Sequence, residues 1–186
     1  MTVIKSDEAE KNALLLAAQL MAVSVRTAPK TRGIDHIVTL IVTGDEKERL
    51  AQMMEQKVEQ KTKRLQFFKR DATNLRRSPV ALLIGVQGTH TEGIDCGACG
   101  YPACDAFSKA ETKNGEDFTG PNCIFKAIDL GIALGSAGKV ASELNIDNRL
   151  MYTVGAAAKA LGLLDADVII GIPLSVSGKN IFFDRK

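Results

Sequence analysis

Two periods of hydrophobic spacing run along this chain, and together they predict a mixture of helices and strands. Short runs of β-branched and other apolar residues, typical of buried strands, occupy residues 37–42 and 80–86. The remaining elements expected are helices at residues 6–25, 46–75, 105–113, 124–144 and 149–161 and strands at 168–172 and 180–183. The fold class expected is therefore α+β, a mixed α/β arrangement, in a single domain that covers residues 1–186.

The first two predicted helices carry further local signals. Ser6 can cap the first helix, and the acidic residues Asp7 and Glu8 suit the positive end of its dipole. The helix predicted at 46–75 has less regular apolar spacing, so a break near residues 61–63 is expected. Residues 46–77 hold ten Lys or Arg against five Asp or Glu. Such a basic helix is usually a solvated face, and docking of an acidic redox partner is the alternative.

The helix predicted at residues 124–144 is rich in small residues, among them Gly131, Gly135 and Gly138. A glycine inside a helix is less favourable than alanine by about 1 kcal/mol, so this density calls for a packing reason. Close approach of a second helix is the simplest reason. That helix belongs either to the same subunit or to the second copy in a homodimer.

The composition is that of a globular protein with a buried core, at 45% apolar and 25% charged residues. A net charge of +2 gives no indication of a nucleic-acid partner. No apolar run approaches the roughly 20 residues of a membrane-spanning helix, and the N-terminal segment lacks the basic start and cleavage site of a signal peptide. The expected location is the cytoplasm, where cysteines remain reduced thiols.

The chain has four cysteines, and all lie within 28 residues: Cys96, Cys99, Cys104 and Cys123. Their spacing is C-x2-C-x4-C-x18-C. Three thiolates close in sequence can wrap one face of a cubane, and a distant fourth can close the other side, as four-thiolate ligation of a [4Fe–4S] cluster requires. Gly97 and Gly100 ease tight turns and let backbone N–H groups approach the cluster sulfurs.

A tetrahedral zinc site of four thiolates is the alternative that these residues leave open. Zinc sites usually pair two short C-x2-C elements, whereas here one such pair is followed by two single cysteines. The spacing and the glycines together favour the cluster over zinc, and over four cysteines that bind no metal.

The stretch Cys-Gly-Ala-Cys-Gly-Tyr-Pro-Ala-Cys104, with a later cysteine, resembles the iron–sulfur module of corrinoid iron–sulfur proteins and of the B subunit of a membrane electron-transport complex. The resemblance implies that all four cysteines ligate a [4Fe–4S] cluster and that residues 95–123 form an inserted module. The whole chain also resembles a family of prokaryotic proteins described as containing a ferredoxin domain, a description that conveys no substrate.

The residues on either side of the cysteines resemble FMN-dependent nitroreductases in the order of their elements. The likeness is carried by Ser24-Val25-Arg26, Ala28-Pro29, the helix start at Asp45, and Val168-Ile-Ile-Gly-Ile-Pro173. It implies a nitroreductase-like α+β homodimer with FMN at the interface, and it places Arg26, Lys30 and Arg32 at the flavin phosphate. From the residues alone, these cations follow a helix C-terminus and complement its dipole.

The leading functional hypothesis is an iron–sulfur redox protein that exchanges single electrons with a partner protein or with small-molecule donors and acceptors. The alternatives are an FMN-dependent oxidoreductase with an auxiliary cluster and a structural or regulatory zinc protein. If the protein is an enzyme, it is an oxidoreductase, since two histidines offer little for hydrolysis. His36 is interpreted as structural. His90 is interpreted as a loop residue, with tuning of the cluster as the alternative.

Overall fold

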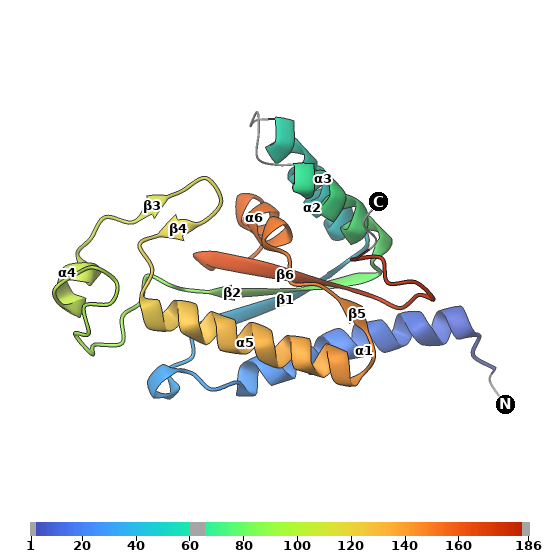
Figure 1. Ribbon diagram of the computed structural model, residues 1–186, viewed down its shortest axis with the longest axis horizontal. Coiled ribbons are helices and arrows are strands. Elements are labelled where there is room, and N and C mark those ends of the chain that lie inside the picture. The colour runs from blue at the N-terminus through green and yellow to red at the C-terminus, as the bar shows by residue number, and fades with distance from the viewer. Residues whose placement is uncertain (1–2, 60–65, 184–186) are drawn as a thin grey trace.

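A four-stranded antiparallel sheet separates two layers of helices (Figure 1). The computed structural model describes residues 3–59 and 66–183. The helices are α1 (Ser6–Thr27), the short 3-10 turn η1 (Thr31–Gly33), α2 (Gly44–Glu59), α3 (Gln66–Arg77), α4 (Cys104–Ser108), α5 (Ile124–Glu143) and α6 (Tyr152–Ala160). The strands are β1 (Ile37–Thr43), β2 (Val80–Val86), β3 (Lys113–Asn114), β4 (Thr119–Gly120), β5 (Asp147–Asn148) and β6 (Val168–Ser175).

Strand β2 lies inside the sheet and is buried along its whole length. The strand order is β1-β2-β6-β5, and every pair is antiparallel, with Ile37 of β1 opposite Val86 of β2. Because helices cover both faces, β2 is a continuous apolar run. Successive side chains point to opposite faces, so Leu82 belongs to the core beside α1 and α5 and Leu83 to the core beside α2, α3 and α6.

The helix α6 lies very close to the sheet. A Cβ added at Gly155 would lie 1.7 Å from the carbonyl oxygen of Ile169 in β6. Helix α5 packs against α1 through Ala133 and Ala137, which are fully buried. The close helix packing expected for residues 124–144 is therefore present within the subunit, between α5 and α1. Alanines of α5 form this contact.

Three predicted strands are confirmed and one is wrong. Residues 37–42 and 80–86 form β1 and β2, and the strand expected at 168–172 continues to Ser175. Residues 180–183 form no strand. The Asn180 side chain accepts a hydrogen bond from the backbone of Phe182 (2.9 Å) and donates to Asp147 (2.8 Å), which bends the chain there. The edge of the sheet beside β6 is formed instead by the two-residue strand β5.

The helix predictions need four corrections. Lys5 occupies the N-cap position of α1 without a side-chain capping bond, and Ser6 lies inside the helix, where its hydroxyl donates to Glu10 (2.6 Å). The helix expected at 105–113 is only the five-residue α4, and the one expected from 149 begins at Tyr152. The helix predicted at 46–75 is two helices, α2 and α3. Its expected break at 61–63 lies outside the described residues.

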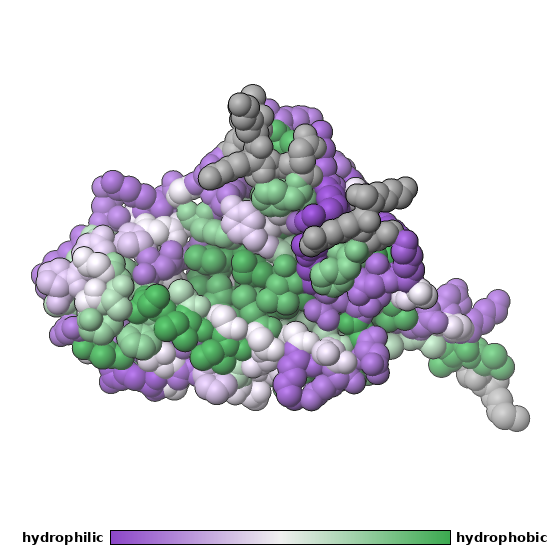
Figure 2. Space-filling view, viewed as in Figure 1, coloured by the Kyte–Doolittle hydropathy of each residue, from purple (hydrophilic) through white to green (hydrophobic). Residues whose placement is uncertain are grey.

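One side of α5 carries apolar side chains that no other element covers. Ile124, Ile128 and Ile132 are 37%, 46% and 39% exposed, and Figure 2 shows apolar residues gathered along this helix and the strands beside it. A Cβ added at Gly131 or Gly135 would meet no atom within 4 Å. Within the described part of the chain, no helix has the length and apolar character that crossing a membrane requires.

Candidate iron–sulfur site

The cysteine-containing segment leaves the scaffold at the end of β2 and returns to it at the start of α5 (Figure 1). The two ends lie side by side, because the backbone N–H of Cys123 donates to the carbonyl oxygen of Gly88 (2.8 Å). A Cβ at Gly88 would lie 1.8 Å from Asn122 Oδ1, so a larger residue at this crossing would require the Asn122 side chain to move. Between these ends the chain forms α4 and the small β3–β4 hairpin.

Three of the cysteines share one short loop that is held by its own hydrogen bonds. The carboxylate of Asp95 accepts from the backbone N–H of Cys104 (2.7 Å), and the N–H of Asp95 donates to Cys104 Sγ (3.4 Å). Gly97 and Gly100 have φ angles of +68° and +88°, which L side chains rarely adopt. The loop therefore turns tightly between the first, second and third cysteines, and one backbone N–H already points at a sulfur.

The four cysteines differ in exposure, and all are free thiols. Cys96 is exposed, Cys99 and Cys104 are half-buried, and Cys123 is buried at the N-cap of α5. A helix N-terminus favours negative charge, as a thiolate carries. Among the described residues, no three His, Cys, Asp or Glu side chains are grouped to hold a single metal ion. In chemistry and number the donors fit the four-thiolate set of an iron–sulfur cluster.

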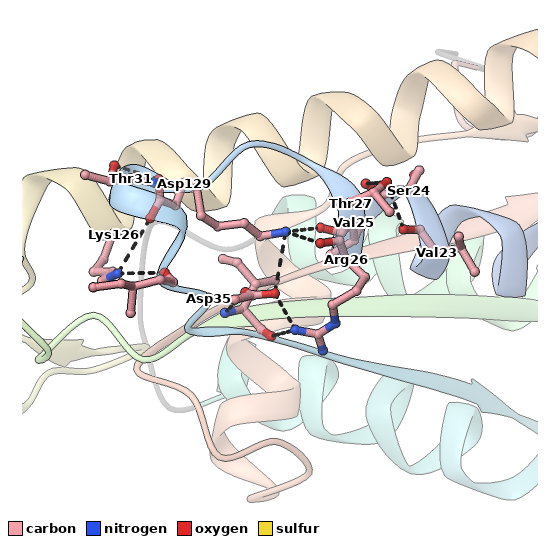
Figure 3. A network of polar contacts seen from close by, with 12 residues as sticks. Val23, Ser24, Val25, Arg26, Thr27, Thr31, Asp35, Lys126 and Asp129 are labelled. Carbon is pink, nitrogen blue, oxygen red and sulfur yellow. Dashed lines mark hydrogen bonds and ion pairs between the residues drawn. The ribbon is translucent and has the colours of Figure 1, made fainter.

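The three basic residues that the nitroreductase likeness places at a flavin phosphate all have partners within the chain, and Figure 3 shows the pairing of Arg26 with Asp35. Lys30 Nζ donates to two carbonyl oxygens at the end of α1, at 2.5 and 2.7 Å. Arg26 forms an ion pair with Asp35, and Arg32 Nη1 donates to the carbonyl oxygen of Glu92 (2.5 Å). Lys30 thus satisfies the negative end of α1, while the side chain of Arg26 remains 60% exposed.

The environment of Asp35 favours its charged form. Burial by itself would raise the pKa of Asp35. The hydrogen bond from the Ile37 N–H and the nearby charges of Arg26 and Lys30 outweigh burial, so the pKa lies below its ordinary value. The basic residues at the end of α1 therefore stabilise a carboxylate of the same chain.

A buried ionic cluster lies next to the base of the cysteine-containing segment, and the sequence analysis did not identify it. Lys126, in the first turn of α5, is fully buried, pairs with Glu92, and has its Nζ 3.7 Å from Asp129 Oδ2. It also donates to the carbonyl oxygen of Ile34 (3.2 Å), while the backbone N–H and hydroxyl of Thr31 each donate to Asp129 at 2.9 Å. The sequence signal for this cluster is weak, since the lysine and aspartate merely share the buried stripe of an otherwise apolar helix.

The two histidines of the chain stack on each other beside this cluster. The rings of His36 and His90 are 4.4 Å apart and nearly parallel, at 9°. His36 Nδ1 is buried and has no hydrogen-bond partner in the described structure. Burial, followed by the positive charge of Lys126 and by His90, lowers the pKa of His36, against the opposing carboxylates of Glu92 and Asp35. His36 and His90 therefore belong to the same electrostatic environment as the ionic cluster.

The fold is that of the nitroreductases. A nitroreductase with bound FMN from Desulfitobacterium hafniense DCB-2 is 13% identical, with a TM-score of 0.55 over 96% of this chain and 82% of that one. A nitroreductase family protein from Clostridium novyi NT is 14% identical, with a TM-score of 0.53 over 96% of this chain and 76% of that one. The predicted fold class, a nitroreductase-like α+β scaffold with an inserted cysteine module, is confirmed.

Sequence comparison identifies the family. A protein from Archaeoglobus fulgidus is 52% identical over 170 residues, which cover 91% of this chain and 90% of the archaeal one. The family model described as "Uncharacterized protein containing a ferredoxin domain" matches residues 119–185, and the model described as "Putative Fe-S cluster" matches residues 92–119. The chain belongs to this ferredoxin-domain family, and the second match contains Cys96, Cys99 and Cys104.

Proposed function

We propose that this protein is an iron–sulfur redox protein that binds one [4Fe–4S] cluster through Cys96, Cys99, Cys104 and Cys123. The observation that carries the proposal is the placement of the four cysteines. All four are free thiols, three are in a tight loop within the segment that matches an Fe–S family, and the fourth is at the base of the same segment. Four thiolates are the usual protein ligands of such a cluster.

The chain's own residues would orient and tune the ligands. The hydrogen bonds described for residues 95–104 are local and join that loop to itself or to α4, so the loop has few ties that oppose its closing on a cluster. The N–H of Asp95 that donates to Cys104 Sγ is the kind of hydrogen bond that influences a cluster's reduction potential. A bound cluster of this kind supplies one-electron transfer. The exposed Cys96 lies where a redox partner can approach.

The uncovered face of α5 supports a homodimer as the working assembly. The partner that fits is a second copy of the chain, because Gly131 and Gly135 leave room for close helix approach between exposed isoleucines. A homodimer is therefore part of the proposed function, together with a redox partner protein or small molecule that exchanges electrons.

FMN binding is the second candidate, and the fold favours it. The similar structures include a nitroreductase with bound FMN and an NADPH:FMN oxidoreductase from Vibrio harveyi complexed with NAD+. Of the basic residues that the resemblance assigns to the phosphate, the side chain of Arg26 is 60% exposed and open to a ligand, whereas that of Lys30 is 5% exposed. An FMN-dependent oxidoreductase with an auxiliary cluster is thus supported by fold and weakened by these internal contacts.

The test is anaerobic purification with absorbance, iron, sulfide, zinc and flavin measured on one sample. The proposal expects a broad band near ~400 nm that bleaches with dithionite, and about four iron and four sulfide per chain. Bands near ~450 nm with released FMN would favour the flavin enzyme. About one zinc per chain without sulfide would overturn the proposal in favour of a zinc site.

Substitution of a cysteine tests whether the cysteines, and not other residues of the same segment, bind the cluster. Cys123→Ser is expected to lose most of the iron and sulfide, because it removes the only ligand at the base of the segment. Ser108→Ala, an exposed change in α4, is the matched control and should keep both. A Cys123→Ser protein with normal iron and sulfide content would show that the fourth ligand is not Cys123.

A further inference from the structure

We propose that the stacked pair His36–His90 takes up one proton when one electron enters the four-cysteine site. This inference rests on the proposed function and adds a proton acceptor to it. The electron comes from an electrode in the tests below, and the proton comes from water. The proton binds a lone pair on an imidazole nitrogen, so one negative and one positive charge enter together and no bond within the protein breaks.

The ionic cluster places the histidine pair next to both parts of the cysteine site. Lys126 is three residues after Cys123, which is the N-cap of the same helix. Glu92, its ion-pair partner, is four residues before Cys96. His90 is two residues before Glu92 in the same loop, and His36 stacks on it. The buried residues Lys126 and Glu92 therefore lie between the histidine pair and the two ends of the cysteine-containing segment, and charges in such a buried environment interact more strongly than in water.

Before the electron arrives, the surroundings of the pair disfavour a positive charge, since burial and Lys126 lower the pKa of His36. Lys126 is balanced by two buried carboxylates, Glu92 and Asp129, so this cluster carries a formal charge of −1. Both carboxylates also have an oxygen with no hydrogen-bond donor among the described residues. The remaining charged groups that face the pair come from the α1–β1 connection: Arg26, Lys30, Arg32 and Asp35. These four groups add +2, so the surroundings of the pair carry a formal charge of +1. An electron at the cysteines removes that charge, and a proton on the pair restores it.

The stack limits the uptake to a single proton. Two positive imidazoles 4.4 Å apart would repel each other, so the pair accepts at most one proton. Burial and Lys126 keep His36 largely neutral before the electron arrives, and an added negative charge shifts that balance toward protonation. His90 is exposed and gives the proton a route from solvent.

The experiment is potentiometric titration of the iron-loaded protein from about pH 5.5 to 8.5, a range that spans histidine titration. The expected result is a reduction potential that falls with rising pH by up to about 59 mV per unit, the tenfold change expected for one proton per electron. The double variant His36→Gln/His90→Gln should make the potential independent of pH in this range. Lys139→Gln, an exposed change at the far end of α5, is the matched control and should keep the slope.

A second measurement requires no variant. Reduction of the wild-type protein in weakly buffered solution with a pH indicator should take up close to one proton per electron in the middle of the sloping range. Iron analysis comes first, since protein without iron and sulfide would refute the proposed function and this inference with it. Iron-loaded protein with a flat potential would overturn the inference alone, as would a slope that survives in the double variant.

Discussion

Replacing Lys126 with methionine tests whether the buried ionic cluster is a balanced electrostatic unit. Methionine keeps the unbranched shape of the lysine stem but removes the ammonium group that contacts Glu92 and Asp129. The formal charge of the cluster changes from −1 to −2. Removing one partner of a buried ion pair destabilises proteins by about 3–5 kcal/mol, because the other charge stays buried without compensation. We expect a loss in this range for Lys126→Met.

The charge count predicts an order among three variants. Glu92→Gln leaves Lys126 paired with Asp129 in a neutral cluster, so its loss should be smaller, about 1–2 kcal/mol. The double variant Lys126→Met/Glu92→Gln returns the cluster to −1 and leaves the Asp129 carboxylate with its two donors from Thr31. It should therefore be more stable than Lys126→Met alone, which is the signature of direct coupling between the two residues.

Urea unfolding of the reduced, metal-free protein measures these differences. Far-ultraviolet circular dichroism is the suitable probe because the chain has no tryptophan, and the shift in midpoint times the m-value gives the change in unfolding free energy. Lys139→Met, which breaks an exposed pair with Glu143 on the same helix, should change stability by less than about 1 kcal/mol. The reasoning is refuted if Lys126→Met is no more destabilising than Glu92→Gln.

Three further predictions concern packing, pH and assembly. Gly155→Ala should destabilise the protein by about 3 kcal/mol or more, because its methyl group meets the backbone of β6, whereas Gly138→Ala, with only ordinary contacts, should gain about 0.5–1 kcal/mol; urea midpoints measure both. Asp35→Asn should lose about 1 kcal/mol at pH 7. Because the pKa of Asp35 is lowered, the stabilisation is complete above the ordinary value of 3.8 and is lost as pH falls through the lowered one, so the variant and wild type should converge in acid. Ile128→Lys should convert the dimer to a monomer in light scattering, because it buries a charge in the proposed interface.

Each of these three has an outcome that contradicts it. A Gly155→Ala protein as stable as wild type would mean that α6 does not approach β6 as described. A constant difference between Asp35→Asn and wild type from pH 7 down to about 2 would show that its charge contributes nothing. If wild type is already monomeric, the dimer proposal fails. Val176→Lys, an exposed change away from α5, is the control and should leave the dimer intact. If this variant is also monomeric, the Ile128→Lys result is not specific to α5.

The sequence by itself determined the features that depend on neighbouring residues. The apolar run at residues 80–86 identified the strand β2, and the period of small and apolar residues located α5 to within one residue of its end. The four cysteines and their glycines indicated an iron–sulfur segment, because ligand type and turn geometry are encoded within a few residues. These signals needed no knowledge of what the segments pack against.

Tertiary structure decided the features that depend on residues distant in the chain. Pairing of Lys126 with Glu92, and stacking of His36 on His90, follow from how β2, α5 and the α1–β1 connection meet at one end of the sheet. Residues 180–183 have a strand-like composition but bend through contacts of Asn180, while β5 takes the edge. A buried charge or an edge strand is stable only when a distant group compensates it, and no local pattern records which group that is.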